Sequence, residues 1–209
     1  MPLVTGPDIQ TLIGSLRKRK ALLWHACQLV DFRGHLQLGG VASRAHFQAT
    51  GTPFTQFQTD GRDVENGVWD KVFFNFSDFG NCFANAHNCT PNAYGPIMLA
   101  FNPSVITGAA DASITLRSAG AEGFNRVAEG ILAAAVDQLY QQGTCYVAYP
   151  EKLAKIFGVE AHSPEMNCHF AAGVAPLAHL AYVVVDPYMA GETALADLVR
   201  NALGADLAH

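Results

Sequence analysis

The chain has 209 residues, of which 50% are hydrophobic and 15% are charged, a composition typical of a compact globular domain and not of a disordered chain. The net charge of −5 excludes a general polycation, so contact with nucleic acid would require a local basic patch. Five irregularly spaced cysteines predict no disulfide framework, and the first twenty residues do not resemble a secretory signal. We expect one domain over residues 1–209, in the cytoplasm and without membrane contact.

The first half of the chain predicts short helices and strands separated by Gly-rich or polar segments. Apolar residues recur at helical spacing in two segments, and the second segment ends at Gly39-Gly40, as helices often do. The basic run Arg17 to Lys20 is best explained as the solvated end of the first helix. We expect helices over 8–19 and 28–38, strands over 21–25 and 72–76, and a long loop over 50–66.

The second half predicts four further strands and two helices. The strands are short runs rich in apolar and β-branched residues, and the segment 124–140 has the clearest helical pattern of the chain. The elements do not alternate regularly, and no GxGxxG follows a strand, which argues against a doubly wound parallel sheet. We expect strands over 95–101, 113–116, 168–172 and 181–186, and helices over 124–140 and 191–203.

Three sequence features could carry chemistry. His25 and Cys27 lie at the end of a buried strand just before a helix, a common place for ligand contacts. Arg44 follows a glycine-rich bend and could grip a phosphate with its planar guanidinium. The aromatic strand around Phe74 could stack a flat ring. Taken singly, each feature is better explained by ordinary core or surface roles.

In this order, the features resemble the DarT-like family of NAD-dependent ADP-ribosyltransferase toxins, which act on single-stranded DNA. The resemblance runs from about residue 21 to residue 186 and depends on the order and spacing of short motifs. The matching segments are Leu23-Trp24-His25-Ala26-Cys27, Gly39-Gly40 with Arg44, Val72 to Ser77, Gly95-Pro96-Ile97-Met98-Leu99, Ser113-Ile114-Thr115-Leu116 and Cys168-His169-Phe170 with Pro176.

The resemblance implies an α+β fold of the ADP-ribosyltransferase type, with split mixed or antiparallel sheets forming an NAD cleft and with flanking helices. It implies transfer of ADP-ribose from NAD, as substrate, to a nucleic-acid base, with single-stranded DNA as the expected acceptor. It further implies a toxin of a toxin–antitoxin or anti-phage defence system, and thus an antitoxin protein as a possible partner.

The resemblance also implies roles for individual residues. His25 would bind the adenosine-side ribose, Arg44 would hold the diphosphate or position the acceptor, and Phe74 would sandwich the nicotinamide. Cys27 and Ser77 are further expected cofactor-binding residues. The reaction develops positive charge on the ribose, so a fixed negative group should lie beside it.

The position of that catalytic carboxylate is where the chain departs from the family. Alignment on Phe170 and Pro176 puts His169 there, whereas Glu165 lies four residues earlier. Pro164 disfavours a regular strand at Glu165, so the sequence favours His169 as the residue in the site. The alternative to an enzyme is therefore a non-catalytic or weakly active module that binds NAD or ADP-ribose.

Two other kinds of site can be drawn from the sequence. A cysteine hydrolase would pair Cys27 with His25, although nothing marks an oxyanion hole. A zinc site could use Cys82, His87 and Cys89, but their spacing fits no common zinc knuckle, so we expect no metal.

Overall fold

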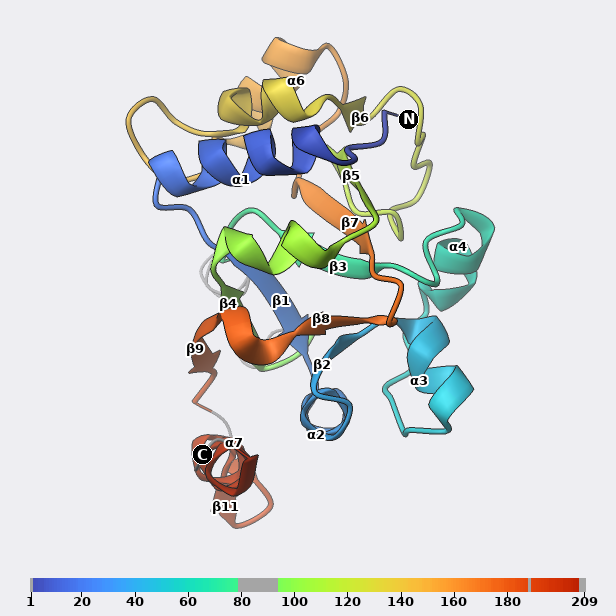
Figure 1. Ribbon diagram of the computed structural model, residues 1–209, viewed down its shortest axis with the longest axis vertical. Helices are drawn as coiled ribbons and strands as arrows, with labels where there is room; N and C mark the ends of the chain where they lie inside the picture. Colours follow the sequence, from blue (N-terminus) through green and yellow to red (C-terminus); the bar gives the residue numbers. More distant parts are fainter. Residues whose placement is uncertain (1, 79–93, 188, 207–209) are drawn as a thin grey trace.

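The computed structural model describes residues 2–78, 94–187 and 189–206, and its centre is a seven-stranded antiparallel sheet (Figure 1). The strand order is β6-β5-β7-β3-β1-β4-β9. These strands are β1 (Leu23–Cys27), β3 (Val72–Asn75), β4 (Ile97–Phe101), β5 (Asp111–Thr115), β6 (Gly130–Ile131), β7 (Glu165–His169) and β9 (Leu180–Val185). Two smaller pairs consist of β2 (Gly40–Ala42) with β8 (Val174–Pro176) and β10 (Met189–Ala190) with β11 (Thr193–Ala194).

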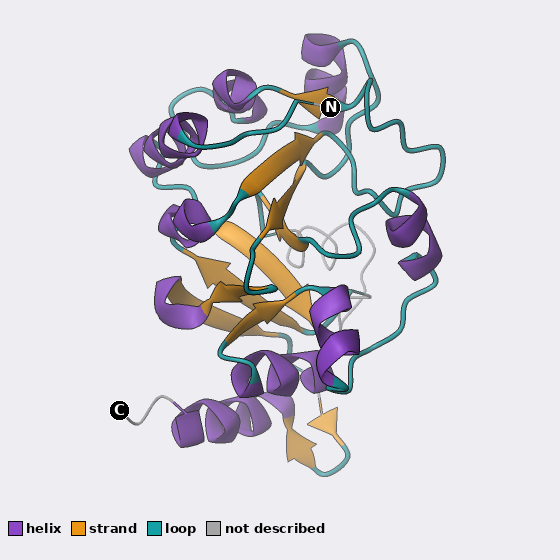
Figure 2. Ribbon diagram, turned by 45° about the vertical axis from the view of Figure 1, so that its right-hand side comes forward, coloured by secondary structure: helices purple, strands orange, loops and turns teal. Residues whose placement is uncertain are grey.

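Most of the helices lie around the large sheet, and a separate two-stranded hairpin lies at one end of the molecule (Figure 2). The α-helices are α1 (Pro7–Lys18), α2 (Leu29–Gln37), α3 (Arg44–Thr50), α4 (Asp60–Glu65), α6 (Pro150–Phe157) and α7 (Leu195–Asp206). Three 3-10 helices are η1 (Pro103–Gly108), η2 (Ala133–Leu139) and η3 (Leu177–His179). None of the described helices is both long and apolar enough to cross a membrane.

The large sheet is joined at its middle by very little pairing. Five residue pairs join β1 to β4, and four join β3 to β7. Between β1 and β3, the single pair is Trp24 with Asn75. Further along, a side chain takes the place of a backbone hydrogen bond between β1 and β3. The Nδ1 atom of His25 lies 2.9 Å from the carbonyl oxygen of Phe73. The sheet therefore consists of two halves, β6-β5-β7-β3 and β1-β4-β9, with a narrow junction between them.

The two faces of β3 have different surroundings. Val72 and Phe74 are buried in the core, where the Phe74 ring meets Phe101 edge to face at 5.7 Å. Phe73 and Asn75 alternate with them and point to the opposite face of the sheet, as the period of a strand requires. This alternation decides which side of the aromatic strand can meet a ligand.

Most predicted elements agree with the structure within a few residues, but the helix expected over 124–140 is wrong. Its residues form turns, β6 and η2. Val127 and Leu132, which the helical pattern would bury, are 76% and 62% exposed. Glu129 instead turns inward to bind Arg117, with contacts of 2.6 and 2.8 Å, and this buried ion pair fixes the turn.

The other differences are smaller. The segment 50–66, expected to be a loop, contains α4, and the short helices α3 and α6 were not expected. The strand expected over 168–172 is β7, which starts directly after Pro164 and ends at His169. Proline is compatible with that place, because the residue before a strand needs no ladder hydrogen bond.

Candidate functional site

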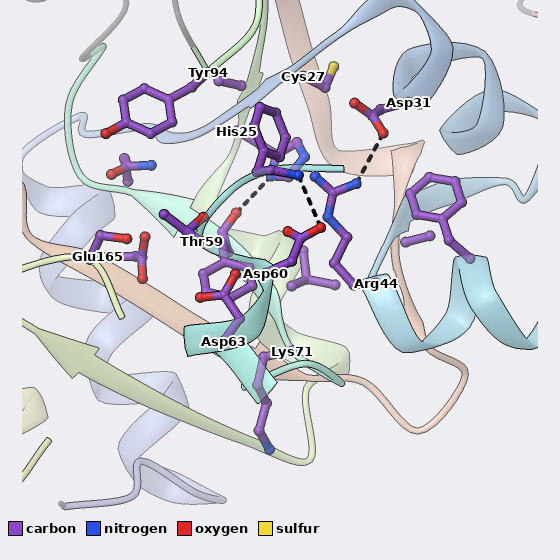
Figure 3. Close-up of a pocket in the computed structure, with 18 of the residues that line it drawn as sticks. His25, Cys27, Asp31, Arg44, Thr59, Asp60, Asp63, Lys71, Tyr94 and Glu165 are labelled. Atoms are coloured by element: carbon purple, nitrogen blue, oxygen red, sulfur yellow. Dashed lines mark hydrogen bonds and ion pairs between the residues drawn. The ribbon is translucent and has the colours of Figure 1, made fainter. Parts of the chain in front are cut away.

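A pocket lies at the junction of the two half-sheets, with walls from both halves and from the segments that cover them (Figure 3). β1 contributes His25 and Cys27, while β7 contributes Glu165 from the other half. The remaining polar or aromatic lining residues come from α2, α3, α4, β3 and the connecting segments, and they are Asp31, His35, Arg44, Phe47, Phe57, Thr59, Asp60, Asp63, Lys71, Phe73, Asn75, Tyr94 and Ser118. The junction thus brings distant parts of the sequence to one site.

The structure brings together four of the residues that the sequence singled out. His25, Cys27, Arg44 and Glu165 all line the pocket. Phe74 does not line it, because it faces the core, and its place beside the pocket is taken by Phe73. Ser77 follows β3 and does not line the pocket either.

The structure places Glu165 in the pocket wall and His169 outside it. A strand rises about 3.3 Å per residue, so His169 lies roughly 13 Å along β7 from Glu165, although both point to the same face. His169 instead contacts Asp111 at 3.5 Å and Asp70 at 3.7 Å, outside the pocket. β7 therefore contributes Glu165, and not His169, to the pocket.

Glu165 is held by hydrogen-bond donors in a nearly dry environment. Its side chain accepts the backbone N–H of Ala119 at 3.3 Å, and it is also hydrogen-bonded by Ser118 and Asn167. Burial raises the pKa of Glu165 to about 7, and these hydrogen bonds only partly oppose the effect. Glu165 is thus a rigidly placed carboxyl group that changes charge near neutral pH.

Arg44 is fixed in the opposite wall by an ion pair and two aromatic rings. Its Nη1 donates to Asp31 Oδ1 at 3.1 Å, and its guanidinium carbon lies 5.2 Å from the ring centres of both Phe54 and Phe57. Asp31 is 2% exposed and also accepts the N–H of Thr55 at 2.8 Å. A guanidinium that is held by an ion pair and packed against two rings presents its remaining donors in a fixed direction, as recognition of an anion requires.

Two adjacent histidines in the pocket wall have opposite hydrogen-bonding roles. His25 Nδ1 donates to the carbonyl of Phe73, so its Nε2 is an acceptor, and burial lowers the pKa of His25 to about 4. His35 is reversed, since its Nδ1 accepts the N–H of Ala42 at 3.1 Å and its Nε2 therefore carries the hydrogen. Burial lowers the pKa of His35 as well, so both rings are neutral at pH 7.

The His35 donor has no acceptor among the described residues. Its Nε2 is fully buried and unpaired, and the His35 ring centre lies 5.3 Å from that of His25. A buried unpaired donor costs about 1–3 kcal/mol, so such atoms in native proteins call for an explanation. An acceptor next to a donor in one wall suits a ligand that carries hydroxyl groups.

Cys27 does not have the properties of a catalytic thiol. Burial raises the pKa of the Cys27 thiol well above its ordinary value, and the nearby Asp31 charge adds to the effect. A cysteine nucleophile needs the thiolate form, so the pairing of Cys27 with His25 does not support a hydrolase. Cys82, His87 and Cys89, the residues of the possible zinc site, lie outside the described residues.

Sequence reasoning missed several residues of this pocket. Asp31 could have been found, because Gln28 and Asp31 form a reciprocal capping box at the start of α2. Asp60 and Asp63 lay in a segment expected to be a loop, and His35 lay among helix residues without a distinguishing pattern.

Compared with models of known protein families and with curated proteins, the chain matches none.

Proposed function

We propose that this protein is an NAD-dependent ADP-ribosyltransferase that modifies a nucleic-acid base, with single-stranded DNA as acceptor. The observation that carries the proposal is that His25, Arg44 and Glu165 line one pocket although they come from β1, α3 and β7. These are the hydroxyl-binding, phosphate-binding and charge-stabilising groups that the reaction needs. The DarT resemblance supplies the acceptor and the role as a toxin with an antitoxin partner.

Each side chain has a part that its surroundings suit. His25 Nε2 accepts a hydrogen bond from a ribose hydroxyl, and the opposed His35 donates to a second oxygen. Arg44 binds the diphosphate through the donors that Asp31 leaves free. Glu165, in its ionised form, lies beside the ribose carbon from which nicotinamide departs and stabilises the developing positive charge.

The arrangement of the sheet also supports the proposal. A split sheet with the ligand between its halves is what the DarT resemblance implies. Here the halves meet through one backbone pair, and the pocket lies at that junction. Because so few backbone hydrogen bonds join β1 to β3, a ligand can lie between these two strands while the pairing within each half of the sheet is retained.

The direct test incubates the purified protein with NAD and labelled single-stranded DNA of mixed sequence. The proposal expects release of nicotinamide and a gain in oligonucleotide mass of one ADP-ribose. RNA of the same sequence and a denatured protein serve as separate acceptors. Release of nicotinamide without a gain in oligonucleotide mass would contradict the nucleic-acid part of the proposal. If no nicotinamide were released, the proposed enzymatic activity itself would be contradicted.

The second candidate is a module that binds NAD or ADP-ribose without turnover. It was suggested by the apparent absence of a carboxylate, and Glu165 in the pocket weakens that argument. Burial raises the pKa of Glu165 to about 7, and this shift toward the neutral form favours the second candidate, because a neutral carboxyl group cannot stabilise a cation. Binding of NAD by calorimetry without nicotinamide release would identify this candidate.

Replacing Arg44 by Ala should weaken NAD binding by about 1.5–3 kcal/mol, the usual size of a charge-assisted hydrogen bond. The variant also leaves Asp31 buried without its cation, which adds repulsion toward a diphosphate. Calorimetric titration with NAD measures the change. Arg33→Ala, an exposed arginine on α2 outside the pocket, should bind as the unaltered protein does. If both variants bound NAD with equal affinity, Arg44 would not contribute to NAD binding.

The rate of nicotinamide release should depend on pH through Glu165. The carboxylate form is the active one, and the pKa of Glu165 is about 7, so kcat/KM should fall as the pH is lowered through 7. His25 and His35 should not add a step near pH 7, because burial lowers the pKa of His25 to about 4 and lowers the pKa of His35 as well. Initial rates between pH 5 and 9 measure the profile, and a constant rate from pH 6 to 8 would contradict the assignment.

A further inference from the structure

Four carboxyl groups line the described part of the pocket, and they have different partners. Asp31 accepts hydrogen bonds from Arg44 and from backbone amides. Asp60 Oδ2 accepts the N–H of Phe57 at 3.0 Å. Glu165 is held by Ala119, Ser118 and Asn167. Each of these three groups therefore has donors that fix it and favour its charged form.

Asp63 is the fourth carboxyl group, and within the described chain its side chain has no hydrogen-bond donor. It lies on α4 beside the pocket, close enough to Glu165 for the negative charge of Asp63 to raise the pKa of Glu165 (Figure 3). Lys71, the lysine of this pocket, is paired with Asp111 at 3.2 Å and with Asp70 at 3.9 Å. No described cation is thus paired with the Asp63 carboxylate.

The surroundings of Asp63 suit a group that takes up a proton. Burial raises the pKa of Asp63 to about 6, the neighbouring charge of Asp60 adds to the effect, and the charge of Arg44 only partly opposes it. A general base works best when its pKa lies near the working pH and when its lone pairs are free. The buried, unpaired Nε2 of His35 in the same pocket independently indicates that a polar ligand belongs there.

We infer that Asp63 is the general base for the acceptor, distinct from Glu165, which serves the ribose cation. This inference rests on the proposed transferase function and divides its two half-reactions between two carboxylates of one pocket. Asp63 comes from α4 and Glu165 from β7, so the two carboxylates reach the pocket from different elements. The acceptor class is a nucleobase that attacks through a nitrogen carrying a proton.

The bonds and protons of the step balance without a further reactant. The bond between the ribose carbon and nicotinamide breaks, and its electron pair leaves with neutral nicotinamide. The lone pair of the acceptor nitrogen forms the new bond to the same carbon. The proton of that nitrogen passes to the Asp63 carboxylate and later to solvent. Water can replace the acceptor, and attack by water on a cation needs little help from a base.

The experiment measures both half-reactions in one series with NAD and labelled single-stranded DNA. Asp63→Asn should lower ADP-ribose transfer to the oligonucleotide by about 10²-fold or more, the usual contribution of a general base. Nicotinamide release by hydrolysis, measured without DNA, should stay within a few-fold of the original. Retained release also shows that the variant is folded and binds NAD. Glu65→Asn, the same loss of a carboxylate on the exposed side of α4, is the matched control and should change neither rate.

The outcomes separate this inference from the proposed function. An unaltered protein that releases no nicotinamide would overturn the transferase proposal and the inference with it. An active protein whose Asp63→Asn variant transfers at the original rate would overturn only the base. Loss of release and transfer to the same extent would also overturn it, because Asp63 would then serve bond cleavage or NAD binding. Selective loss of transfer supports the assignment.

Discussion

Replacing Glu165 by Gln should lower nicotinamide release by about 10²–10³-fold, the effect of removing one electrostatic group aimed at a developing charge. Gln retains a side-chain oxygen for the Ala119 N–H and nearly the same volume, so the fold and NAD affinity should change little. The loss should therefore appear in kcat and not in KM. Measured rates of release from NAD, together with calorimetric binding to the same variant, test both parts.

The matched control is Glu151→Gln, which makes the same change at an exposed carboxylate on α6, far from the pocket lining. Its rate should equal that of the unaltered protein. A parallel His169→Gln variant should also retain full activity, because His169 lies outside the pocket. If His169→Gln were inactive and Glu165→Gln active, the geometry would have assigned the wrong residue of β7.

Replacing Glu129 by Ala should lower the free energy of unfolding by about 3–5 kcal/mol, the usual cost of breaking a buried ion pair by removing one partner. Glu129 is 4% exposed and binds the 9% exposed Arg117 through two hydrogen bonds. Burial raises the pKa of Glu129, but the hydrogen bonds from Arg117 and from the Asn125 N–H, together with the Arg117 charge, outweigh burial and lower it. The stabilisation should therefore be present at neutral pH and be lost as the pH falls below the ordinary range of a glutamate.

Urea unfolding at pH 7 measures this change. Asp197→Ala removes one partner of the exposed Arg200 pair on α7 and should cost less than about 1 kcal/mol. If the two variants lost similar free energies of unfolding, the buried Arg117–Glu129 ion pair would contribute no more to stability than an exposed pair does. The comparison matters for the site, because Arg117 starts the turn whose Ser118 and Ala119 hold Glu165.

The sequence predicts those parts of the fold that depend on local periodicity. The helix near the N-terminus and the strands around His25, Phe74 and Leu99 agree because their apolar pattern matches their burial. The segment 124–140 fails because a distant partner, Arg117, draws Glu129 inward and makes the local pattern irrelevant. Such an ion pair between separate turns leaves no periodic signal in the chain.

The candidate site was predictable in part for a similar reason. The resemblance to the DarT-like family implied that His25 and Arg44 would lie in one cleft, and both residues line the pocket. The choice between Glu165 and His169 was not predictable, since it depends on which end of β7 lies at the sheet junction. Likewise, Phe73 and Phe74 are neighbours in sequence, and only the twist and pairing of β3 decide which one faces the ligand.

The single backbone pair between β1 and β3 has a consequence for the lifetime of the protein. Contacts between cooperative units open more readily than contacts within them, so local opening should begin between the two half-sheets. A ligand that touches His25 on one half and Glu165 on the other must be released before they separate, and it therefore opposes opening in proportion to its concentration. The resistance of this protein to proteolysis would then rise with the concentration of a ligand bound between the two halves, and depletion of that ligand would shorten its survival.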